Sequence, residues 1–150
     1  MMRLQNKVAV VTGAGSGMGK AIAVLYAKEG AKVVVSDIKV DSANTTVEEI
    51  KSNGGNAIAV MANVAIEKDI QNLIDSAVNK FSTIDVLVNN AGYALVGPFE
   101  ELAIEEFKEQ FETNVFGVIR VTQAVLPIMR RQKCGTIINI SSIAGKIGFP

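Results

Sequence analysis

The sequence predicts a doubly wound α/β fold, in which helices cover both faces of a parallel sheet with strand order 3-2-1-4-5. Two observations predict it. Five short apolar runs, rich in valine and isoleucine, alternate with longer amphipathic stretches. Most of these runs are apolar at successive positions and do not alternate with polar residues, which is typical of strands buried on both faces. Right-handed crossovers with one reversal of direction give the strand order, and ligands then bind at the carboxyl ends of strands 1 and 4.

The predicted strands are the apolar runs Val8–Val11, Lys32–Ser36, Ala57–Met61, Ile84–Asn89 and Thr136–Ile140. The predicted helices are Lys20–Lys28, Asn44–Ser52, Glu67–Lys80 and Ile104–Gln132. Asn44 is the expected N-cap of the second helix, and Gly54 with Gly55 is expected to end it. The last and longest stretch is predicted to be one helix, with Gly117 and Pro127 as the expected points of bending or termination.

Composition excludes several classes of function. The 150 residues, 49% of them apolar, are enough for one compact domain, and the 15 basic and 15 acidic residues cancel. We therefore expect no nucleic-acid partner. An apolar stretch of about 20 residues and a secretory signal are both missing from the sequence, so no membrane partner is expected either. The absence of histidine excludes histidine triads and histidine-ligated zinc, and no metal is expected.

The single cysteine, Cys134, has no partner for an internal disulfide. We interpret it as a small thiol near a helix end, because nothing in the surrounding sequence suggests an activated thiolate. A chain without disulfides suits a reducing compartment, so a cytoplasmic protein is predicted.

A glycine-rich turn, Thr-Gly-Ala-Gly-Ser-Gly-Met-Gly, connects the first strand to the first helix. Unpaired backbone N–H groups and the positive end of the helix dipole attract a diphosphate at such a junction. The turn does not fit the phosphate-loop pattern G-x-x-x-x-G-K-[ST] or the pattern G-x-G-x-x-G, but it matches T-G-x-x-x-G-x-G. Its predicted cofactor contacts are Gly13, Ser16, Gly17, Met18 and Gly19. The alternative is that the glycines only permit a tight turn.

Asp37 ends the second strand, 18 residues after Gly19. A carboxylate there accepts hydrogen bonds from both ribose hydroxyls of an adenosine and repels a 2′-phosphate. Lys39 is the only cation near it in the sequence. We therefore predict NAD over NADP, with Asp37 and the adjacent Ile38 in the cofactor site. The alternative is that Asp37 is a turn or cap residue.

These motifs, taken in order, resemble those of the short-chain dehydrogenase/reductase family over essentially all 150 residues. The matching features are Thr12–Gly19, Asp37, Asn89-Asn90-Ala91-Gly92, Asn114 within a helix, and the segment Asn139–Gly145. The resemblance implies a Rossmann-type fold, a nicotinamide cofactor contacted by Asn90, Ala91 and Gly92, and oligomerisation. It also implies hydride transfer between a small-molecule alcohol and a ketone or aldehyde.

The resemblance also assigns individual roles. Ser142 matches the serine that hydrogen-bonds the reacting oxygen, with Ser141 as the alternative. Asn114 matches the asparagine that holds a water in a proton relay. After the third strand, Asn63, followed by Val64, replaces the aspartate that commonly contacts adenine. An amide oxygen can still accept a hydrogen bond from the adenine amino group, so we expect a modest effect.

One departure from the family pattern concerns the proton donor. The family uses a tyrosine with a lysine four residues later, because a phenol needs a nearby cation to work at neutral pH. The only tyrosines here, Tyr26 and Tyr93, are followed at that spacing by Gly30 and Gly97. Residues 1–150 are therefore interpreted as a single dinucleotide-binding domain, truncated before the later strands and with its fifth strand at an uncovered edge. The alternative is a natural half-length chain.

Three other functions are weighed against the oxidoreductase. The first is a non-catalytic dinucleotide-binding or oligomerisation fragment, which would bind NADH without turning it over. The second is an S-adenosylmethionine-dependent methyltransferase, against which the Asn89–Gly92 and Ser141–Gly145 motifs argue. The third is a hydrolase using Ser142 and Lys146, for which the sequence shows no oxyanion hole.

Overall fold

The structure of the chain is a computed structural model that describes residues 2–147. Its centre is a five-stranded sheet in the order β3-β2-β1-β4-β5, and every neighbouring pair is parallel. The strands are β1 Val8–Thr12, β2 Lys32–Asp37, β3 Asn56–Met61, β4 Val86–Asn89 and β5 Thr136–Asn139. The predicted fold class and strand order are confirmed. The strand order reverses between β1 and β4, so a crevice opens where these strands end.

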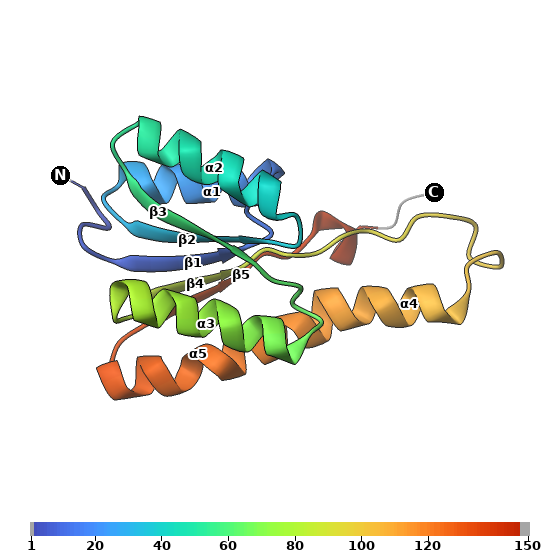
Figure 1. Ribbon diagram of the computed structural model, residues 1–150. Helices are drawn as coiled ribbons and strands as arrows, with labels where there is room; N and C mark the ends of the chain where they lie inside the picture. Colours follow the sequence, from blue (N-terminus) through green and yellow to red (C-terminus); the bar gives the residue numbers. More distant parts are fainter. Residues whose placement is uncertain (1, 148–150) are drawn as a thin grey trace.

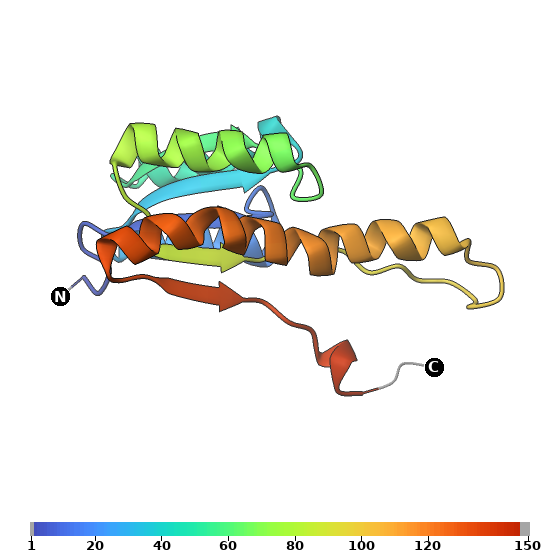
Figure 2. The same ribbon diagram turned by 90° about the horizontal axis from the view of Figure 1, so that it is seen from below.

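Helices form a layer on each face of the sheet (Figure 1). One layer holds α1 Gly17–Lys28 and α2 Val40–Ser52, and the other holds α3 Glu67–Phe81 and α5 Val118–Gln132. The helix α4 Ile104–Phe111 and a π-helical segment, η1 Glu112–Gly117, precede α5, and a 3₁₀ turn, η2 Ile143–Gly145, follows β5. Figure 2 shows α4, η1 and α5 as one continuous rod that extends beyond the sheet.

Each face of the sheet packs its own apolar cluster. Val10 and Leu87 pack with Leu73 of α3 on one face, whereas Val11 and Val35 pack with helices α1 and α2 on the other. All of these side chains are completely buried. Consecutive strand residues point to opposite faces, so both clusters need apolar residues at every position. This explains the continuous apolar runs of the sequence.

Two helix starts differ from the prediction. Helix α2 begins at Val40 with Lys39 as its N-cap, so the prediction of Asn44 as the cap was wrong. The reason lies outside the helix: the Asp37 carboxylate accepts the Lys39 backbone N–H at 3.0 Å, which turns the chain into a helix directly after β2. Helix α1 begins at Gly17, so the glycine-rich turn runs into the first helical turn.

The long rod of α4, η1 and α5 is continuous, as predicted, but its middle is π-helical. Gly117 ends that π segment, and Pro127 lies inside α5, which continues to Gln132. Strand β5 lies at the edge of the sheet with its residues only half-buried or exposed, as expected. Among residues 2–147, no helix has both the length and the apolar character to cross a membrane.

Candidate functional site

The glycine-rich turn leaves the start of α1 bare. Gly13 and Gly17 have positive φ angles of 62° and 53°, which glycine adopts without strain. A Cβ on Gly17 would meet nothing within 4 Å, so the space before the helix is open. A Cβ on Gly19 would instead collide with the Gly13 carbonyl and the Asn90 side chain. Gly19 therefore serves close packing behind the turn, while Gly17 faces open space.

Thr12 and Asn90 join the ends of β1 and β4. The Thr12 hydroxyl accepts the backbone N–H groups of Asn90 and Ala91, each at 3.0 Å, and donates to the Val88 carbonyl at 3.3 Å. The Asn90 side chain donates to the carbonyls of Thr12 and Gly13 at 3.0 and 3.1 Å. These bonds fix the glycine-rich turn beside the Asn-Ala-Gly segment at the point where the strand order reverses.

Asp37 has a structural role in the turn. Its Oδ2 accepts the Gly15 N–H at 2.9 Å, and its Oδ1 accepts the Lys39 N–H at 3.0 Å. A Cβ on Gly15 would approach Asp37 Oδ2 to 2.8 Å, so only glycine allows this approach. Each carboxylate oxygen still has a second lone pair. The carboxylate can therefore hold the turn and accept ribose hydroxyls at the same time.

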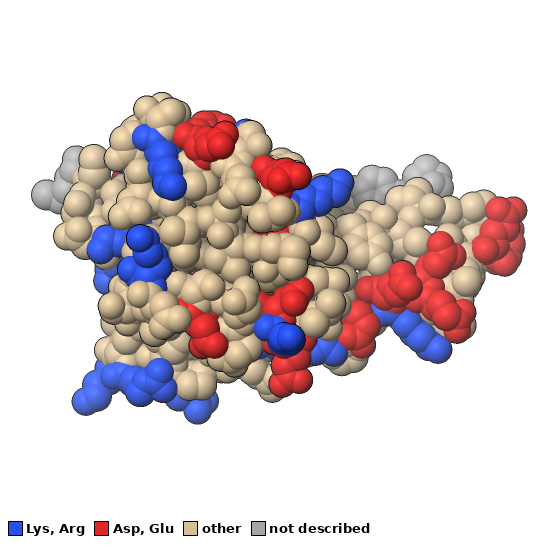
Figure 3. Space-filling view, viewed as in Figure 1, with Lys and Arg blue, Asp and Glu red and all other residues tan. Residues whose placement is uncertain are grey.

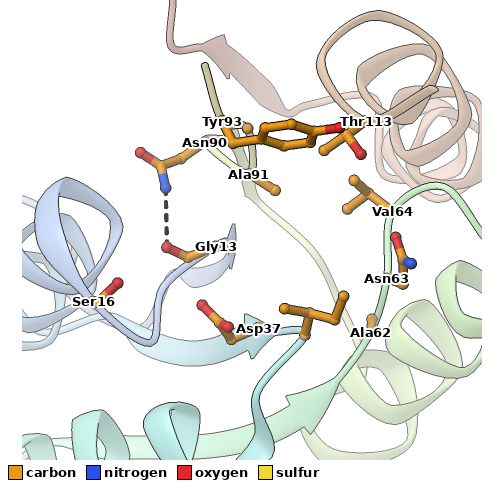
Figure 4. A pocket seen from close by; sticks show the side chains of 12 residues that line it. Gly13, Ser16, Asp37, Ala62, Asn63, Val64, Asn90, Ala91, Tyr93 and Thr113 are labelled. Carbon is orange, nitrogen blue, oxygen red and sulfur yellow. Dashed lines mark hydrogen bonds between the residues drawn. The ribbon is translucent and has the colours of Figure 1, made fainter. Parts of the chain in front are cut away.

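A cleft of about 320 Å³ opens in front of the turn (Figure 4). The predicted cofactor residues that line it are Gly13, Ser16, Asp37, Ile38, Asn63, Val64, Asn90, Ala91 and Gly92. Three further lining residues, Ala62, Tyr93 and Thr113, were not predicted as cofactor contacts. In Figure 4, Asp37 and Tyr93 face the cleft from opposite sides. Each missed residue is adjacent in sequence to a predicted one, and that adjacency is the signal that could have found it.

A second cavity of about 650 Å³ adjoins the cleft, and the Asn90–Tyr93 segment lines both. It brings together Met18, Asn114, Ser141 and Ser142. The other lining residues include Asn89, Ala94, Gln110, Val118, Asn139, Ile140 and Ala144. Gly17 and Gly19 line neither cavity. The predicted catalytic residues therefore share one cavity, and most of the predicted cofactor residues share its neighbour.

Asn114 holds the backbone of Tyr93 with both ends of its amide. Its Oδ1 accepts the Tyr93 N–H at 3.1 Å, and its Nδ2 donates to the Tyr93 carbonyl at 2.7 Å. Gln110 Nε2 donates to the same carbonyl at 3.1 Å. Asn114 belongs to the π-helical segment η1, and such segments occur frequently at functional sites. One hydrogen and one lone pair of its amide remain for a water or a substrate.

Ser142 and Asn63 both keep hydrogen-bonding capacity at the site. Ser142 is exposed, and its Oγ accepts the Ala144 N–H at 3.1 Å, which leaves the hydroxyl hydrogen free to donate. Asn63 Oδ1 accepts the Ala65 N–H at 3.0 Å. The Asn63 amino group has no protein partner among residues 2–147. Ser141, the alternative predicted from the resemblance, lines the same cavity as Ser142.

The sequence model of the family described as short chain dehydrogenase matches residues 7–150. The chain belongs to this family. The resemblance predicted from the motifs is thereby confirmed, and the strand order is that of the predicted Rossmann-type fold. The matched relatives bear oxidoreductase names, so neither the methyltransferase nor the non-catalytic fragment gains support.

This short-chain dehydrogenase chain is similar to several curated proteins. It is 42% identical over 149 residues to an uncharacterized oxidoreductase of Thermotoga maritima, covering 99% of this chain and 59% of that protein. It is 41% identical over 145 residues to the 7α-hydroxysteroid dehydrogenase of Escherichia coli K12, covering 97% and 56%. It is 45% identical over 151 residues to a 3-oxoacyl-[acyl-carrier-protein] reductase of Synechocystis, covering 100% and 61%.

Solved structures agree with this placement in the short-chain dehydrogenase family. A 7α-hydroxysteroid dehydrogenase complexed with NADH and 7-oxo glycochenodeoxycholic acid superposes with a TM-score of 0.94 at 40% identity. The superposition covers 99% of this chain and 58% of that one. The chain thus spans about three fifths of the length of the relatives it matches.

Proposed function

We propose that the protein is an NAD-dependent oxidoreductase that transfers hydride between an alcohol and a ketone or aldehyde. The observation that carries the proposal is the pair of cavities that meet at Asn90–Tyr93. Asp37 and the turn residue Gly13 line one cavity, and Asn114 and Ser142 line the other. A long dinucleotide whose far end must reach a carbonyl fits this arrangement. The oxidoreductase names of the relatives, and the NADH in one related structure, support it.

The residues of the smaller cleft fit an adenosine and a diphosphate. Asp37 would accept the ribose hydroxyls, Asn63 and Val64 would contact the adenine, and Ser16 and the bare turn would hold the diphosphate. Asp37 is the only charged side chain among the described residues that line this cleft. A 2′-phosphate would therefore meet a negative charge with no cation among the described residues that line the cleft, which favours NAD over NADP.

The residues of the larger cavity would orient the substrate. When bound, the nicotinamide ring of the cofactor supplies or takes up the hydride. The Ser142 hydroxyl would donate a hydrogen bond to the substrate oxygen, where negative charge develops in the direction of reduction. Asn114 would hold a water for proton transfer. The proton donor itself is proposed to lie outside these 150 residues, because neither Tyr26 nor Tyr93 is followed by a lysine four residues later.

Association of two copies is proposed through the rod of α4, η1 and α5. Phe111, Phe116 and Ile119 expose 54%, 44% and 45% of their surfaces along this rod. Figure 3 shows acidic side chains over α4 and basic ones at the opposite end of the molecule. Arg130 and Arg131 lie in the last turn of α5. Antiparallel rods would place opposite charges together. We propose a homo-oligomer in the cytoplasm, and a monomer in light scattering of the naturally produced protein would contradict it.

Two single substitutions test the proposed chemistry. In the naturally produced protein, Ser142→Ala should lower kcat by about 10²–10³-fold, because one donor to the developing oxyanion is lost. The Kd for NADH should not change, because Ser142 does not line the cleft assigned to adenosine. Ser141→Ala is the matched comparison, with an expected change of less than about threefold. Equal kcat values for both variants and the unaltered protein would contradict the assignment of a catalytic serine here.

A further inference from the structure

Gly117 closes the π-helical segment η1 against a wall of the cofactor cleft. Its φ and ψ angles are −58° and −47°, which any residue adopts, so its backbone conformation does not require glycine. Space does. A Cβ on Gly117 would lie 2.7 Å from Val64 Cγ2 and 3.2 Å from Val64 Cβ. Ordinary carbon–carbon contacts lie at about 3.5–4.0 Å, so an alanine there would force the helix and Val64 apart by about 1 Å.

Glycine at this position destabilises the helix, although the backbone conformation there does not require it. In a helix interior, glycine stabilises the helix less than alanine does. Gly117 is buried, and Val64 is only 6% exposed, so neither side has free space into which to move. Glycine therefore allows the helix to approach Val64 closely, which a side chain at this position would prevent.

The same short segment carries two residues of the site. Thr113 lines the smaller cleft together with Val64, and Asn114 reaches the larger cavity. The Asn114 amide bonds the Tyr93 backbone at 2.7 and 3.1 Å. Shifting the segment by about 1 Å would stretch both bonds toward or beyond the limit of a hydrogen bond, about 3.5 Å. The close packing of η1 against Val64 therefore fixes the position of Asn114.

We propose that Gly117 is a positioning residue, whose contact with Val64 holds Asn114 in register with the Tyr93 backbone and the two cavities. The proposal rests on the proposed function in one respect, since Asn114 is taken to serve hydride transfer. The contact joins the loop that follows β3 to the middle of the rod, and its two residues, Val64 and Gly117, are 53 positions apart in sequence.

The test is a double-substitution cycle in the naturally produced protein. Gly117→Ala should lower kcat/KM by about 10–100-fold, mainly through kcat, because a misplacement of about 1 Å at a site costs rates of that order. Val64→Ala removes the Cγ2 atom, and its own kcat/KM is the reference value for the double variant. In that background, adding Gly117→Ala should lower kcat/KM by less than about threefold, since the non-additivity of contacting residues reports their coupling. Gln123→Ala, on the exposed face of α5, controls for helix propensity.

Hydrogen exchange of the Tyr93 amide gives a readout that does not need turnover, because this N–H bonds to Asn114. Its protection should fall in Gly117→Ala and return when Val64→Ala is added. Unchanged kinetics and protection in Gly117→Ala, or no recovery in the double variant, would overturn the proposal. If the unaltered protein neither binds nor oxidises NADH, the proposed function fails instead, and the exchange data still decide the role of Gly117.

Discussion

Replacing Asp37 by serine tests how the cleft selects its cofactor. The Asp37 carboxylate is the only charged group among the described residues that line the cleft. It also accepts the backbone N–H groups of Gly15 and Lys39 at 2.9 and 3.0 Å. The substitution therefore removes a negative charge, the proposed ribose acceptors and two hydrogen bonds of the turn at once.

The expected magnitudes follow from these contacts. A hydrogen bond to a charged group contributes about 1.5–3 kcal/mol, so losing the bonds to ribose should raise the Kd for NADH by roughly 10–10²-fold. Two unit charges about 4 Å apart repel by about 4 kcal/mol at an effective dielectric of 20, and less beside solvent. Removing that repulsion should lower the Kd for NADPH. These two changes together should shift the ratio of the dissociation constants for NADH and NADPH by at least about 10²-fold in favour of NADPH.

Fluorescence titration with NADH and NADPH measures both constants directly. The loss of two hydrogen bonds to a charged group in the turn should lower the free energy of unfolding by about 3–6 kcal/mol, so the titration is made well below the melting temperature. Asp37→Asn is the matched control, because it removes the charge but keeps one acceptor oxygen. Asp37→Asn should shift the ratio of the two dissociation constants toward NADPH by less than Asp37→Ser does. A ratio that Asp37→Ser leaves unchanged would refute the role given to this carboxylate.

Three further substitutions have defined outcomes. Thr12→Val leaves the partly buried N–H groups of Asn90 and Ala91 without an acceptor, and should lower the free energy of unfolding by about 2–4 kcal/mol in urea denaturation; an unchanged midpoint would contradict the joining role of the hydroxyl. Gly19→Ala drives a methyl group into the turn and should raise the Kd for NADH at least about tenfold. Leu73→Ala, at a fully buried core position, should cost about 2–5 kcal/mol in urea denaturation without changing the NADH-to-NADPH preference.

The strands and their order could be predicted because the information is local and repeated. Each run of valine and isoleucine specifies a strand buried on both faces, and the handedness of crossovers then leaves few possible orders. The glycine-rich turn, Asp37 and the Asn89–Gly92 segment follow successive strands, so the parallel arrangement alone brings them to one edge of the sheet.

What could not be predicted depends on side-chain contacts that residue patterns do not report. Helix α2 begins at Val40 because the Asp37 side chain accepts the Lys39 N–H, a bond that helix propensity does not report. No residue pattern distinguishes a π-helical segment from the α-helix on either side of it. Gln110 was therefore missed, because which face of the rod meets the cavities depends on that segment and on the approach of Gly117 to Val64.

Oxidation of NADH by the naturally produced protein, followed against a panel of carbonyl compounds, tests the central claim most directly. The panel includes a steroid ketone, a 3-oxoacyl thioester and simple ketones and aldehydes, and S-adenosylmethionine serves as a competing ligand. The account predicts carbonyl-dependent loss of NADH absorbance that falls about 10²–10³-fold in Ser142→Ala. Tight NADH binding without turnover on any carbonyl, or preferential binding of S-adenosylmethionine, would contradict it.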